Sequence, residues 1–448
     1  MAGGKVALPV ATIERLAFGG NGVCRIDGKV CFVPYSCPGD RVSLRITSEK
    51  KSYSTASLAE IREASPSRVT PVCALFGECG GCNWQHINYG VQLEQKRNIL
   101  AECLRKGARV PADCVEETVA APRQYGYRSR VQFKVAVVQG RFLIGFFRHG
   151  SHGVVDAVAG CPVAIPEVNQ LLERCRSELP NCPDYEAFTQ LTIDAGENGV
   201  VLIIHDRGKV TAGKRRYLAD PARNFGPCTG LYLAAGDGSG SLKIGGNGDV
   251  CYSLDSPGQA GTSVSLTYPS GGFAQVNRLQ NSAMVSLVSK LAVFRPSETL
   301  LDLYCGNGNF SLPLAAEVAS VTGVESNAEA CNAAKYNCDI NKVANVEFFC
   351  DDAAAGVARL IGRGRTFNVV LLDPPRAGAG DVLSGILTLQ PDRIIYVSCD
   401  PSTLARDCER LMAGGYRVVT SVPLDMFPQT YHIESITVLG KAGKGDVT

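Results

Sequence analysis

The chain has 448 residues, of which 45% are hydrophobic and 20% are charged, and its formal net charge is +2. This length exceeds what one ordinary core holds, so we expect about two to three domains in a soluble globular protein. No apolar run is long enough for a membrane span and the N-terminus has no signal-peptide pattern, so we expect a cytoplasmic protein without membrane contact. We expect a monomer, in which local basic patches would bind any nucleic acid.

Residues 1–66 predict a small β-barrel. Short strands separated by turns, with an Asp-Gly hairpin signal at 27–28, indicate an OB-like barrel, which is a common platform for nucleic acid. Arginines and lysines are interspersed through the region, and an ordinary solvated surface is the alternative explanation for them. The predicted strands are residues 6–13, 22–26, 29–33, 41–47 and 53–61.

The 19 cysteines are an odd number spread over a long chain, which disfavours a disulfide framework. Three of them, Cys73, Cys79 and Cys82, stand within ten residues, with two glycines between the last two, a pattern that suits a loop folded about a soft metal centre. Cys161, in a Gly-Cys-Pro segment, is the candidate fourth ligand. Zinc is the competing metal, although its structural sites usually have two close cysteine pairs. Four buried cysteines without a metal are the third alternative.

Residues 67–272 predict a central α+β domain that contains these cysteines. A helical segment is expected at 89–107, and residues 125–135 alternate aromatic, basic and apolar side chains, as in a strand with one cationic face. That face suits unpaired RNA, whose bases stack and whose phosphates need cations, and it equally suits any half-buried sheet. Trp84, the only tryptophan, is expected to shield the cysteines or pack in the core, with base stacking as the alternative.

Residues 273–448 predict a doubly wound α/β sheet. Strand patterns alternate with amphipathic segments rich in alanine and leucine, which is typical of βαβ units, and the last two strands are expected to form an antiparallel pair. The predicted strands are residues 299–304, 318–325, 346–351, 368–372, 394–397, 416–424 and 432–439.

A glycine-containing turn follows the first of these strands. Gly306 and Gly308 would let the backbone approach a ligand closely, but their spacing is not that of a pyrophosphate-binding turn. Glu325 ends the next strand, where a ribose diol is usually held. A nucleoside without a pyrophosphate indicates S-adenosylmethionine rather than NAD. Cys305 is expected to serve this turn as a small side chain.

A second motif, Asp373-Pro374-Pro375-Arg376, ends the fourth strand of this region. A D-P-P-x motif at this place is typical of amino-group methyltransferases, in which the fourth residue is an aromatic that stacks on the target base. Arg376 departs from that pattern, and the following strand ends in Cys399. Transfer to carbon 5 of a pyrimidine therefore becomes the favoured chemistry.

Cys399 is the predicted nucleophile because ligands of such sheets bind at the carboxyl ends of the strands. Carbon 5 of a pyrimidine attacks a methyl group only after a thiolate has added to C6, and a separate base must then remove the C5 proton. Glu434 is the predicted base, and a surface glutamate of the last strand is the alternative. A target base inside folded RNA must also be turned out of its stack.

Together these motifs resemble those of the RNA uracil-5-methyltransferases, in particular the iron–sulfur branch that modifies 23S ribosomal RNA. The resemblance covers nearly the whole chain. The matching segments are residues 19–23, 32–34 and 38–40 (the family's TRAM barrel), 79–86 (its cluster signature), 273–277, 398–401 and 432–434. It implies a Rossmann-like class I methyltransferase domain, and a helix at about 89–107 that packs on this catalytic domain.

The resemblance also implies the ligands of two cofactors. By it, Cys73, Cys79, Cys82 and Cys161 would hold a 4Fe–4S cluster. Gln275, Tyr304, Glu325 and Asp373 would bind S-adenosylmethionine. The implied activity is methylation of uridine C5 in structured RNA, with 23S rRNA favoured. The alternatives are the same chemistry on tRNA and, from another class, a non-catalytic RNA-binding protein that keeps the fold.

Overall fold

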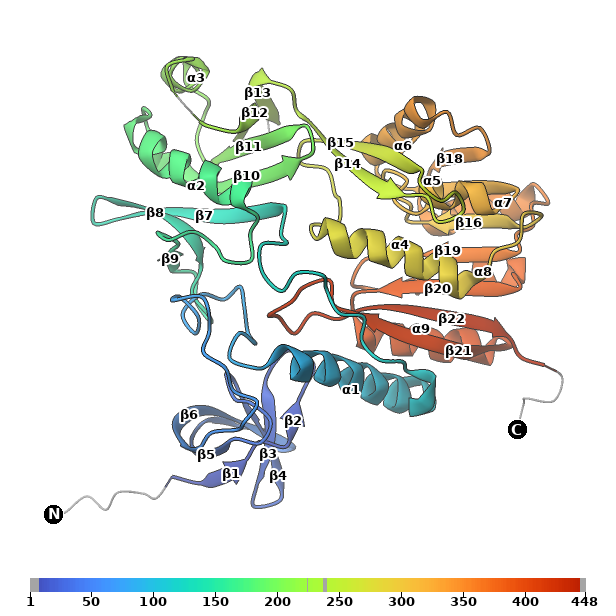
Figure 1. Cartoon of the computed structure of the whole chain (residues 1–448), viewed down its shortest axis with the longest axis horizontal. Coiled ribbons are helices and arrows are strands. Elements are labelled where there is room, and N and C mark those ends of the chain that lie inside the picture. Colours follow the sequence, from blue (N-terminus) through green and yellow to red (C-terminus); the bar gives the residue numbers. More distant parts are fainter. Residues whose placement is uncertain (1–7, 224, 237–239, 444–448) are drawn as a thin grey trace.

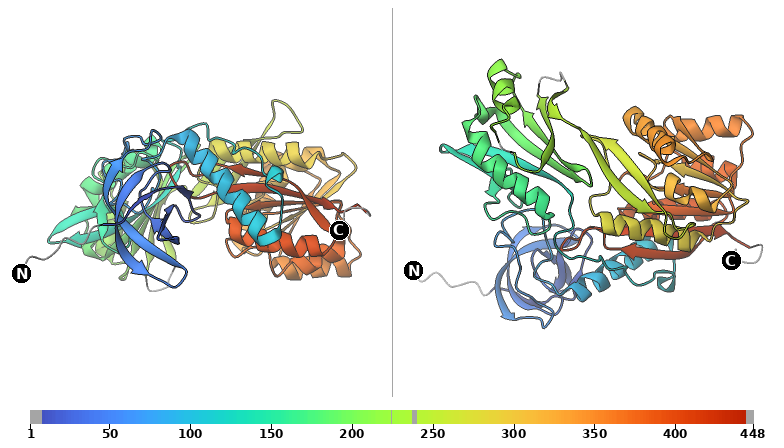
Figure 2. Two further views of the ribbon diagram at one scale, coloured as in Figure 1. Left: turned by 90° about the horizontal axis from the view of Figure 1, so that it is seen from below. Right: turned by 45° about the horizontal axis from the view of Figure 1, so that its top comes forward.

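The computed structural model describes residues 8–443, except for residues 224 and 237–239. Within these residues the strands form four sheets, arranged as three bodies (Figure 1). The N-terminal barrel is blue, the central sheet is cyan to green, and the C-terminal sheet is yellow to red. Two further views show that the barrel lies beside both of the other bodies (Figure 2).

The N-terminal barrel confirms the predicted OB-like fold. Its strands have the order β1-β5-β6-β4-β3-β2, and the sheet curls until β1 lies against β3. The interior is filled by small and branched side chains such as Cys24, Cys31 and Val42. The first predicted strand begins at residue 6, and its residues 6–7 lie outside the described part of the chain. The strands are β1 (Val10–Thr12), β2 (Arg15–Leu16), β3 (Gly22–Ile26), β4 (Lys29–Val33), β5 (Arg41–Glu49) and β6 (Tyr53–Glu63).

The central body is a sheet with the order β13-β12-β11-β10-β7-β8-β9. Apolar residues alternate along β10 and form a continuous buried run along β11, and α2 packs its buried face against the same core. The strands are β7 (Arg130–Val138), β8 (Arg141–Phe147), β9 (Val154–Asp156), β10 (Phe188–Gly196), β11 (Gly199–Asp206), β12 (Cys228–Ala235) and β13 (Ser241–Gly246). The helices are α2 (Pro166–Glu178) and α3 (Ala212–Ala219).

A separate hairpin, β14 (Asp249–Asp255) and β15 (Ser263–Pro269), joins the central body to the C-terminal one. Its buried residues Tyr252 and Leu266 belong to the same apolar core as Met284 of α4 and Leu300 of β16. The predicted limit between domains, at residues 272 and 273, stays a prediction, because the chain packs continuously across it.

The C-terminal sheet is doubly wound, as predicted, with the order β18-β17-β16-β19-β20-β22-β21. The first five of these strands are parallel, whereas β22 runs antiparallel to both of its neighbours. The strands are β16 (Thr299–Leu303), β17 (Ser320–Glu325), β18 (Val346–Cys350), β19 (Val369–Leu372), β20 (Arg393–Ser398), β21 (Tyr416–Leu424) and β22 (Glu434–Lys441).

Helices cover both faces of this sheet (Figure 1). They are α4 (Arg278–Ala292), α5 (Ser311–Leu314), α6 (Ala328–Asn341), α7 (Ala353–Gly362), α8 (Leu383–Leu389) and α9 (Pro401–Ala413). Short 3₁₀ turns are η1 (Ala112–Cys114), η2 (Leu179–Asn181), η3 (Tyr185–Ala187) and η4 (Ala315–Glu317). Among the described residues, no helix has the length and apolar character that a membrane crossing requires.

Helix α1 (Tyr89–Ala108) follows the barrel in sequence but lies along α9 of the C-terminal body (Figure 1). Gly107 permits the close approach, because a Cβ there would stand 2.8 Å from the Cβ of Ala405. Leu100 and Leu104 are fully buried in this contact, and burial of each contributes about 1.5–3 kcal/mol. The same helix also buries polar side chains, which are described below.

Candidate active site

Cys399 and Glu434 lie opposite each other at the ends of two neighbouring strands. β20 and β22 are antiparallel, and their register pairs Ser398 with Ser435. One step further along the same register, Cys399 stands across from Glu434. The Ser435 hydroxyl donates to the carbonyl of Ser398 at 3.4 Å, which ties the two strand ends together. The register thus brings the predicted nucleophile and the predicted base to one place.

The Cys399 thiol is half-buried between the end of β20 and the start of α9. Asp400 caps that helix by accepting hydrogen bonds from the amides of Ser402 and Thr403 at 2.9 and 3.0 Å. Burial, together with the Glu434 and Asp373 carboxylates, raises the pKa of Cys399 to about 12, and Arg376 acts against them. The resting thiol is therefore protonated at neutral pH and becomes nucleophilic only when its proton is removed.

Two carboxyl groups lie beside this thiol. Glu434 is 4% exposed. Burial, followed by the charge of Asp373, raises the pKa of Glu434 well above its usual value, while Arg376 acts against both. Asp373 follows β19, and burial raises its pKa to about 7. A carboxyl group with a pKa near neutrality can take up and release protons at working pH, as general acid–base catalysis requires.

Glu325 holds the glycine-containing turn that follows β16. Its two carboxylate oxygens accept from the amide of Gly306 at 3.0 Å and from the amide of Asn327 at 2.7 Å. A Cβ at Gly306 would meet no atom within 4 Å, so open space lies over this residue. Gly308 has a φ of +91°, and a Cβ there would stand 2.2 Å from Leu312 Cδ1. The backbone conformation of the turn and the close packing of Leu312 in α5 therefore both require a glycine at position 308.

Tyr304 begins this turn in a backbone conformation that non-glycine residues rarely adopt, with a φ of +63°. Its amide donates to the carbonyl of Val324 at 2.9 Å. Burial, followed by the charge of Asp352, raises the pKa of Tyr304 to about 12, so its ring stays neutral. Strained residues concentrate at functional sites, where the surrounding structure holds them in place.

The β14–β15 hairpin supports the turn from the opposite side, a role that sequence analysis missed. The hydroxyl of Tyr252 bonds to the side-chain oxygens of Asn307 and Asn309 at 3.2 and 3.1 Å. Asn307 in turn donates to the carbonyl of Thr267 at 3.2 Å, and Asn337 of α6 donates to the carbonyl of Asn307 at 3.0 Å. The asparagines that alternate with the glycines of this turn were the only sequence signal for such a support.

Gln275 lies in the segment that leads from the hairpin into α4. The amide of Ser129 donates to the carbonyl of Val276 at 2.8 Å. The side chain of Asn277 donates to the carbonyl of Met426 at 3.0 Å. These contacts fix the segment between the start of the central sheet and the loop that precedes Glu434.

The four predicted cysteine ligands line one cavity. It encloses about 50 Å³, several times the roughly 10–15 Å³ that one water molecule requires. The cavity is thus larger than a single ion needs. Its lining includes Cys73, Cys79, Cys82, Cys161, Phe76, Gln85, Tyr127 and Thr430.

Backbone and side-chain hydrogen bonds hold these thiols around the cavity. The amide of Gly81 donates to Cys79 Sγ at 3.4 Å, and the amide of Cys161 donates to Asn169 Oδ1 at 2.8 Å. Burial, reinforced by the neighbouring thiols, raises the pKa of Cys79 to about 11 and that of Cys82 to about 12. Across the described ranges, no three His, Cys, Asp or Glu side chains meet as ligands of one metal ion.

The strand order, the reversed β22, the glycine turn after β16 and the residues at the carboxyl edge of the sheet define the class of protein. It is a class I methyltransferase with a Rossmann-like catalytic domain and an N-terminal barrel. Residues 259–442 match the model of the tRNA (Uracil-5-)-methyltransferase family, and residues 10–67 match that of the tRNA (uracil(54)-C(5))-methyltransferase TRAM domain.

Relatives and a solved structure match nearly the whole chain. The 23S rRNA (uracil(1939)-C(5))-methyltransferase RlmD of Photorhabdus laumondii is 33% identical over 96% of each chain. That of Cronobacter sakazakii is 34% identical over 95% of each chain. The tRNA (uracil-54, C5)-methyltransferase of Pyrococcus abyssi, solved with S-adenosyl-L-homocysteine, has a TM-score of 0.72 and 26% identity, over 96% of this chain and 99% of that chain. The chain belongs to the RNA uracil-C5-methyltransferase family.

The structure gathers most of the predicted site residues at the carboxyl edge of one sheet. Cys399, Glu434 and Asp373 influence one another electrostatically, and Glu325 binds the Gly306 amide. The four cysteines form a separate group at the junction of the central sheet with the loop before Glu434. The individual roles assigned to these residues stay predictions.

Proposed function

We propose that this protein methylates C5 of a uridine in RNA, with Cys399 as the nucleophile and Glu434 as the general base. The observation that carries the proposal is the register of β20 and β22, which sets a thiol opposite a buried carboxyl group at the ligand-binding edge of the sheet. Bound S-adenosylmethionine would supply an electrophilic methyl group.

Each residue then has one task in the reaction. The thiolate of Cys399 adds to C6 of the uridine. The electron pair that this addition places on C5 would form the new bond to the methyl carbon, and S-adenosyl-L-homocysteine would leave as the bond from that carbon to sulfur breaks. Glu434 removes the C5 proton, and the C6–S bond breaks to return the thiolate. Arg376, which lowers the pKa of Cys399 and of Glu434, favours the charged forms that both steps need.

Cofactor binding is assigned to the turn after β16 and its partners. Open space over Gly306 and the position of Glu325 at the end of β17 support binding of the nucleoside part of S-adenosylmethionine. Tyr304 opens the same turn, and Asp373 directly follows the adjacent strand β19. We include Gln275 because its segment is fixed between the central sheet and the loop that precedes Glu434.

The favoured substrate is 23S rRNA. Curated relatives that carry this substrate in their names are 33–34% identical and aligned over at least 95% of both chains. The alternative, tRNA, is supported by the archaeal structure, which is less similar in sequence at 26% identity. Both alternatives require the same catalytic residues.

The four cysteines suit an iron–sulfur cluster. All four line one cavity, every donor is a thiol, and the space exceeds that of a single ion. Thiols that stand around a cavity rather than meeting at one point are expected when the bound body is a cluster of several atoms. Cys73, Cys79, Cys82 and Cys161 would hold it, and it would fix the fold of this loop.

The catalytic roles are tested with two variants. Cys399→Ala should lower methyl transfer by about a thousandfold or more, abolish trapping by RNA that contains 5-fluorouridine, and keep S-adenosyl-L-homocysteine binding. Glu434→Gln should accumulate a covalent protein–RNA adduct on denaturing gels. Turnover by the Cys399→Ala variant, or the absence of any adduct with the Glu434→Gln variant, contradicts the corresponding assignment.

The RNA substrate is tested by mass-spectrometric mapping of 5-methyluridine in cells that lack the gene. Loss of one 5-methyluridine from 23S rRNA, restored by the intact gene but not by the Cys399→Ala variant, is the expected result. Loss from tRNA with unchanged rRNA would establish the alternative.

The cluster is tested by metal analysis of anaerobically purified protein. We expect about four irons and four sulfides per chain, with visible absorption from charge transfer. Replacing Cys82 with serine should lower the iron content strongly, whereas replacing the exposed Cys350 with serine should leave it unchanged. One zinc per chain would overturn the assignment.

A further inference from the structure

The loop between β21 and β22 (residues 425–433) leads directly to Glu434 and is anchored along its backbone. The amide of Asp425 donates to the carbonyl of Val119 at 3.0 Å. The carbonyl of Pro428 accepts from the Tyr127 hydroxyl at 3.0 Å. The carbonyl of Gln429 accepts from the backbone amides of residues 83 and 84 at 3.1 Å each; these belong to the segment that carries three of the cysteines, residues 73–86, called the cysteine loop below. Three separate parts of the chain therefore fix this loop.

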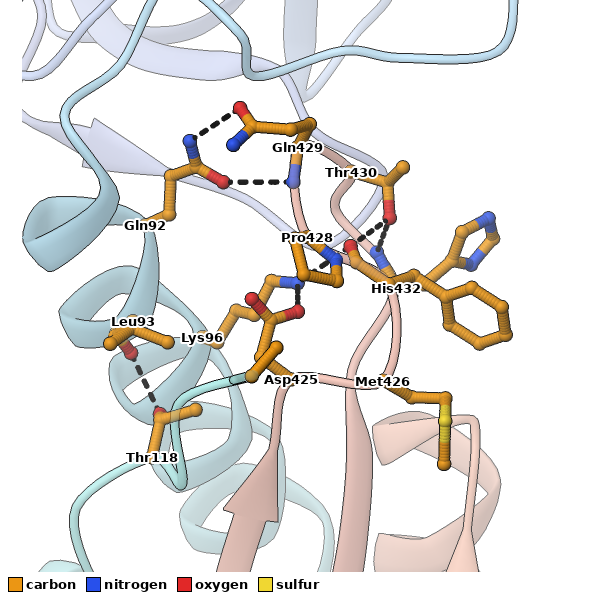
Figure 3. A network of polar contacts seen from close by, with 12 residues as sticks. Gln92, Leu93, Lys96, Thr118, Asp425, Met426, Pro428, Gln429, Thr430 and His432 are labelled. Carbon is orange, nitrogen blue, oxygen red and sulfur yellow. Dashed lines mark hydrogen bonds and ion pairs between the residues drawn. The ribbon is translucent and has the colours of Figure 1, made fainter. Parts of the chain in front are cut away.

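Helix α1 adds two side-chain contacts to the same loop (Figure 3). The side chain of Gln92 makes two hydrogen bonds to Gln429. Its Nε2 donates to Gln429 Oε1 at 3.0 Å, and its Oε1 accepts from the backbone N–H of Gln429 at 3.1 Å. One turn further along α1, Lys96 Nζ donates to Asp425 Oδ1 at 2.5 Å and to the carbonyl of Phe427 at 3.3 Å. The helix thus holds the loop at its start and at its middle.

The Lys96–Asp425 ion pair is completely buried, with 0% of either side chain exposed. Burial lowers the pKa of Lys96, and the Asp425 carboxylate acts against this effect. Replacing a buried ion pair by apolar side chains is often neutral or stabilising. Stability therefore does not explain this pair, whereas fixing the path of the loop does.

The end of the loop is also held in place, directly before Glu434. Ile433 is buried in an apolar cluster with Ile99 of α1 and Trp84 of the cysteine loop. Thr430 donates to the carbonyl of Phe427 at 2.7 Å and accepts from the His432 amide at 3.3 Å, which closes the loop on itself. Glu434 follows Ile433 directly, so the position of its carboxyl group depends on the path of this loop.

We propose that Lys96 and Gln92 are positioning residues that set Glu434 for removal of the C5 proton. They reach the base through Asp425 and Gln429 and touch no reacting atom. The inference rests on the proposed function, because it takes Glu434 as the general base. Helix α1, which lies far from the strands of the site in sequence, would thus control the removal of the C5 proton.

The main test replaces both charges at once, with Lys96→Met and Asp425→Asn in one protein, which nearly preserves volume and leaves no unpaired charge. We expect multiple-turnover methylation to fall about tenfold or more, with accumulation of the covalent adduct on ordinary uridine RNA. Trapping by 5-fluorouridine RNA, which needs Cys399 but no proton removal, should stay within about twofold of the wild type, as should S-adenosyl-L-homocysteine binding.

The chain offers a matched control in Lys214 and Asp206, which form a second buried ion pair at 2.5 Å, between α3 and β11 of the central sheet. The variant with Lys214→Met and Asp206→Asn should show wild-type turnover and no adduct. Gln92→Met is the second test variant, to be used if the double variant does not fold. It should show the same separation of turnover from trapping, with a smaller fold-change.

The outcomes separate this inference from the proposed function. If turnover and trapping fall together in the Lys96 and Gln92 variants, or if neither changes, the positioning role is overturned. If Glu434→Gln itself accumulates no adduct, the proposed function fails first. If Glu434→Gln accumulates adduct and the Lys96 and Gln92 variants do not, only the positioning role fails.

Discussion

The Cys399 thiol is surrounded by charges of both signs, and its ionisation depends on their balance. Burial has the largest effect and raises the pKa of the thiol, Glu434 and Asp373 raise it further, and Arg376 lowers it. A nucleophile with a raised pKa reacts slowly with adventitious electrophiles, because little thiolate is present at neutral pH. The burial of the thiol and the charges around it therefore protect Cys399 in the resting state.

This balance predicts opposite effects of two neutralising substitutions. Glu434→Gln removes a carboxyl group that raises the pKa of Cys399, so this pKa should fall and alkylation of Cys399 by iodoacetamide at pH 8 should be about three- to tenfold faster. Arg376→Gln removes the opposing charge, so the pKa should rise and alkylation should slow. Below the thiol pKa, the rate should increase with pH in every variant.

Alkylation is followed by mass spectrometry of the peptide that contains Cys399. The peptide with the exposed Cys350 provides an internal control, and its rate should be the same in all variants. Equal rates for Cys399 in wild type and in both variants would show that Glu434 and Arg376 do not act on the thiol.

At the scale of elements, the position of Cys399 depends on how α9 begins. Asp400 accepts from two amides of the first turn of α9, and Pro401 is placed at the first helical position, where its missing N–H costs nothing. Cys399 thus stands between a fixed strand end and a capped helix start.

Removal of the cap should loosen this helix start locally. Asp400→Ala should lower the local stability by about 1 kcal/mol, which makes amide exchange at Ser402 and Thr403 about fivefold faster. Asp400→Ser, which keeps an acceptor at the cap, should exchange nearly as slowly as the wild type. Exchange of α6 amides serves as the internal reference. Equal exchange in the Ala and Ser variants would contradict the capping role.

The elements of the barrel and of the doubly wound sheet could be predicted from the sequence, because their apolar and polar residues follow the periods of strands and helices. The expected helix at 89–107 matches α1, Tyr89–Ala108. Its buried face could not be predicted, since Gln92, Gln95 and Lys96 are polar residues that a periodicity argument assigns to solvent. Their partners lie in the barrel and in the loop after β21.

In the candidate site, too, contacts between distant segments could not be predicted from the sequence. Motifs identify Cys399, Glu434 and Glu325 by their places at strand ends. Support of the glycine turn by Tyr252 depends on a hairpin that folds back from another part of the chain, and no local pattern encodes such a contact. Sequence therefore predicts residues at the ends of regular elements better than the residues that hold them in place.

At the scale of the whole molecule, the barrel, the cysteine loop, α1 and the loop before β22 meet around one apolar cluster. Leu16 of the barrel, Trp84 of the cysteine loop, Ile99 of α1 and Ile433 before the base are all buried in it. The amide of Leu16 also donates to Gln95 of α1 at 2.9 Å. The barrel and the loop before Glu434 are consequently held by the same contact surface.

Trp84 at the centre of this cluster is the single tryptophan of the chain. Its indole N–H donates to the carbonyl of Gly20 in the barrel at 3.0 Å, and Lys96 lies 5.7 Å from the centre of its ring. The protein therefore carries one intrinsic fluorophore at the point where barrel, cysteine loop and α1 converge. Its emission can be followed without any label, and exposure of this junction to water would be visible as a red shift.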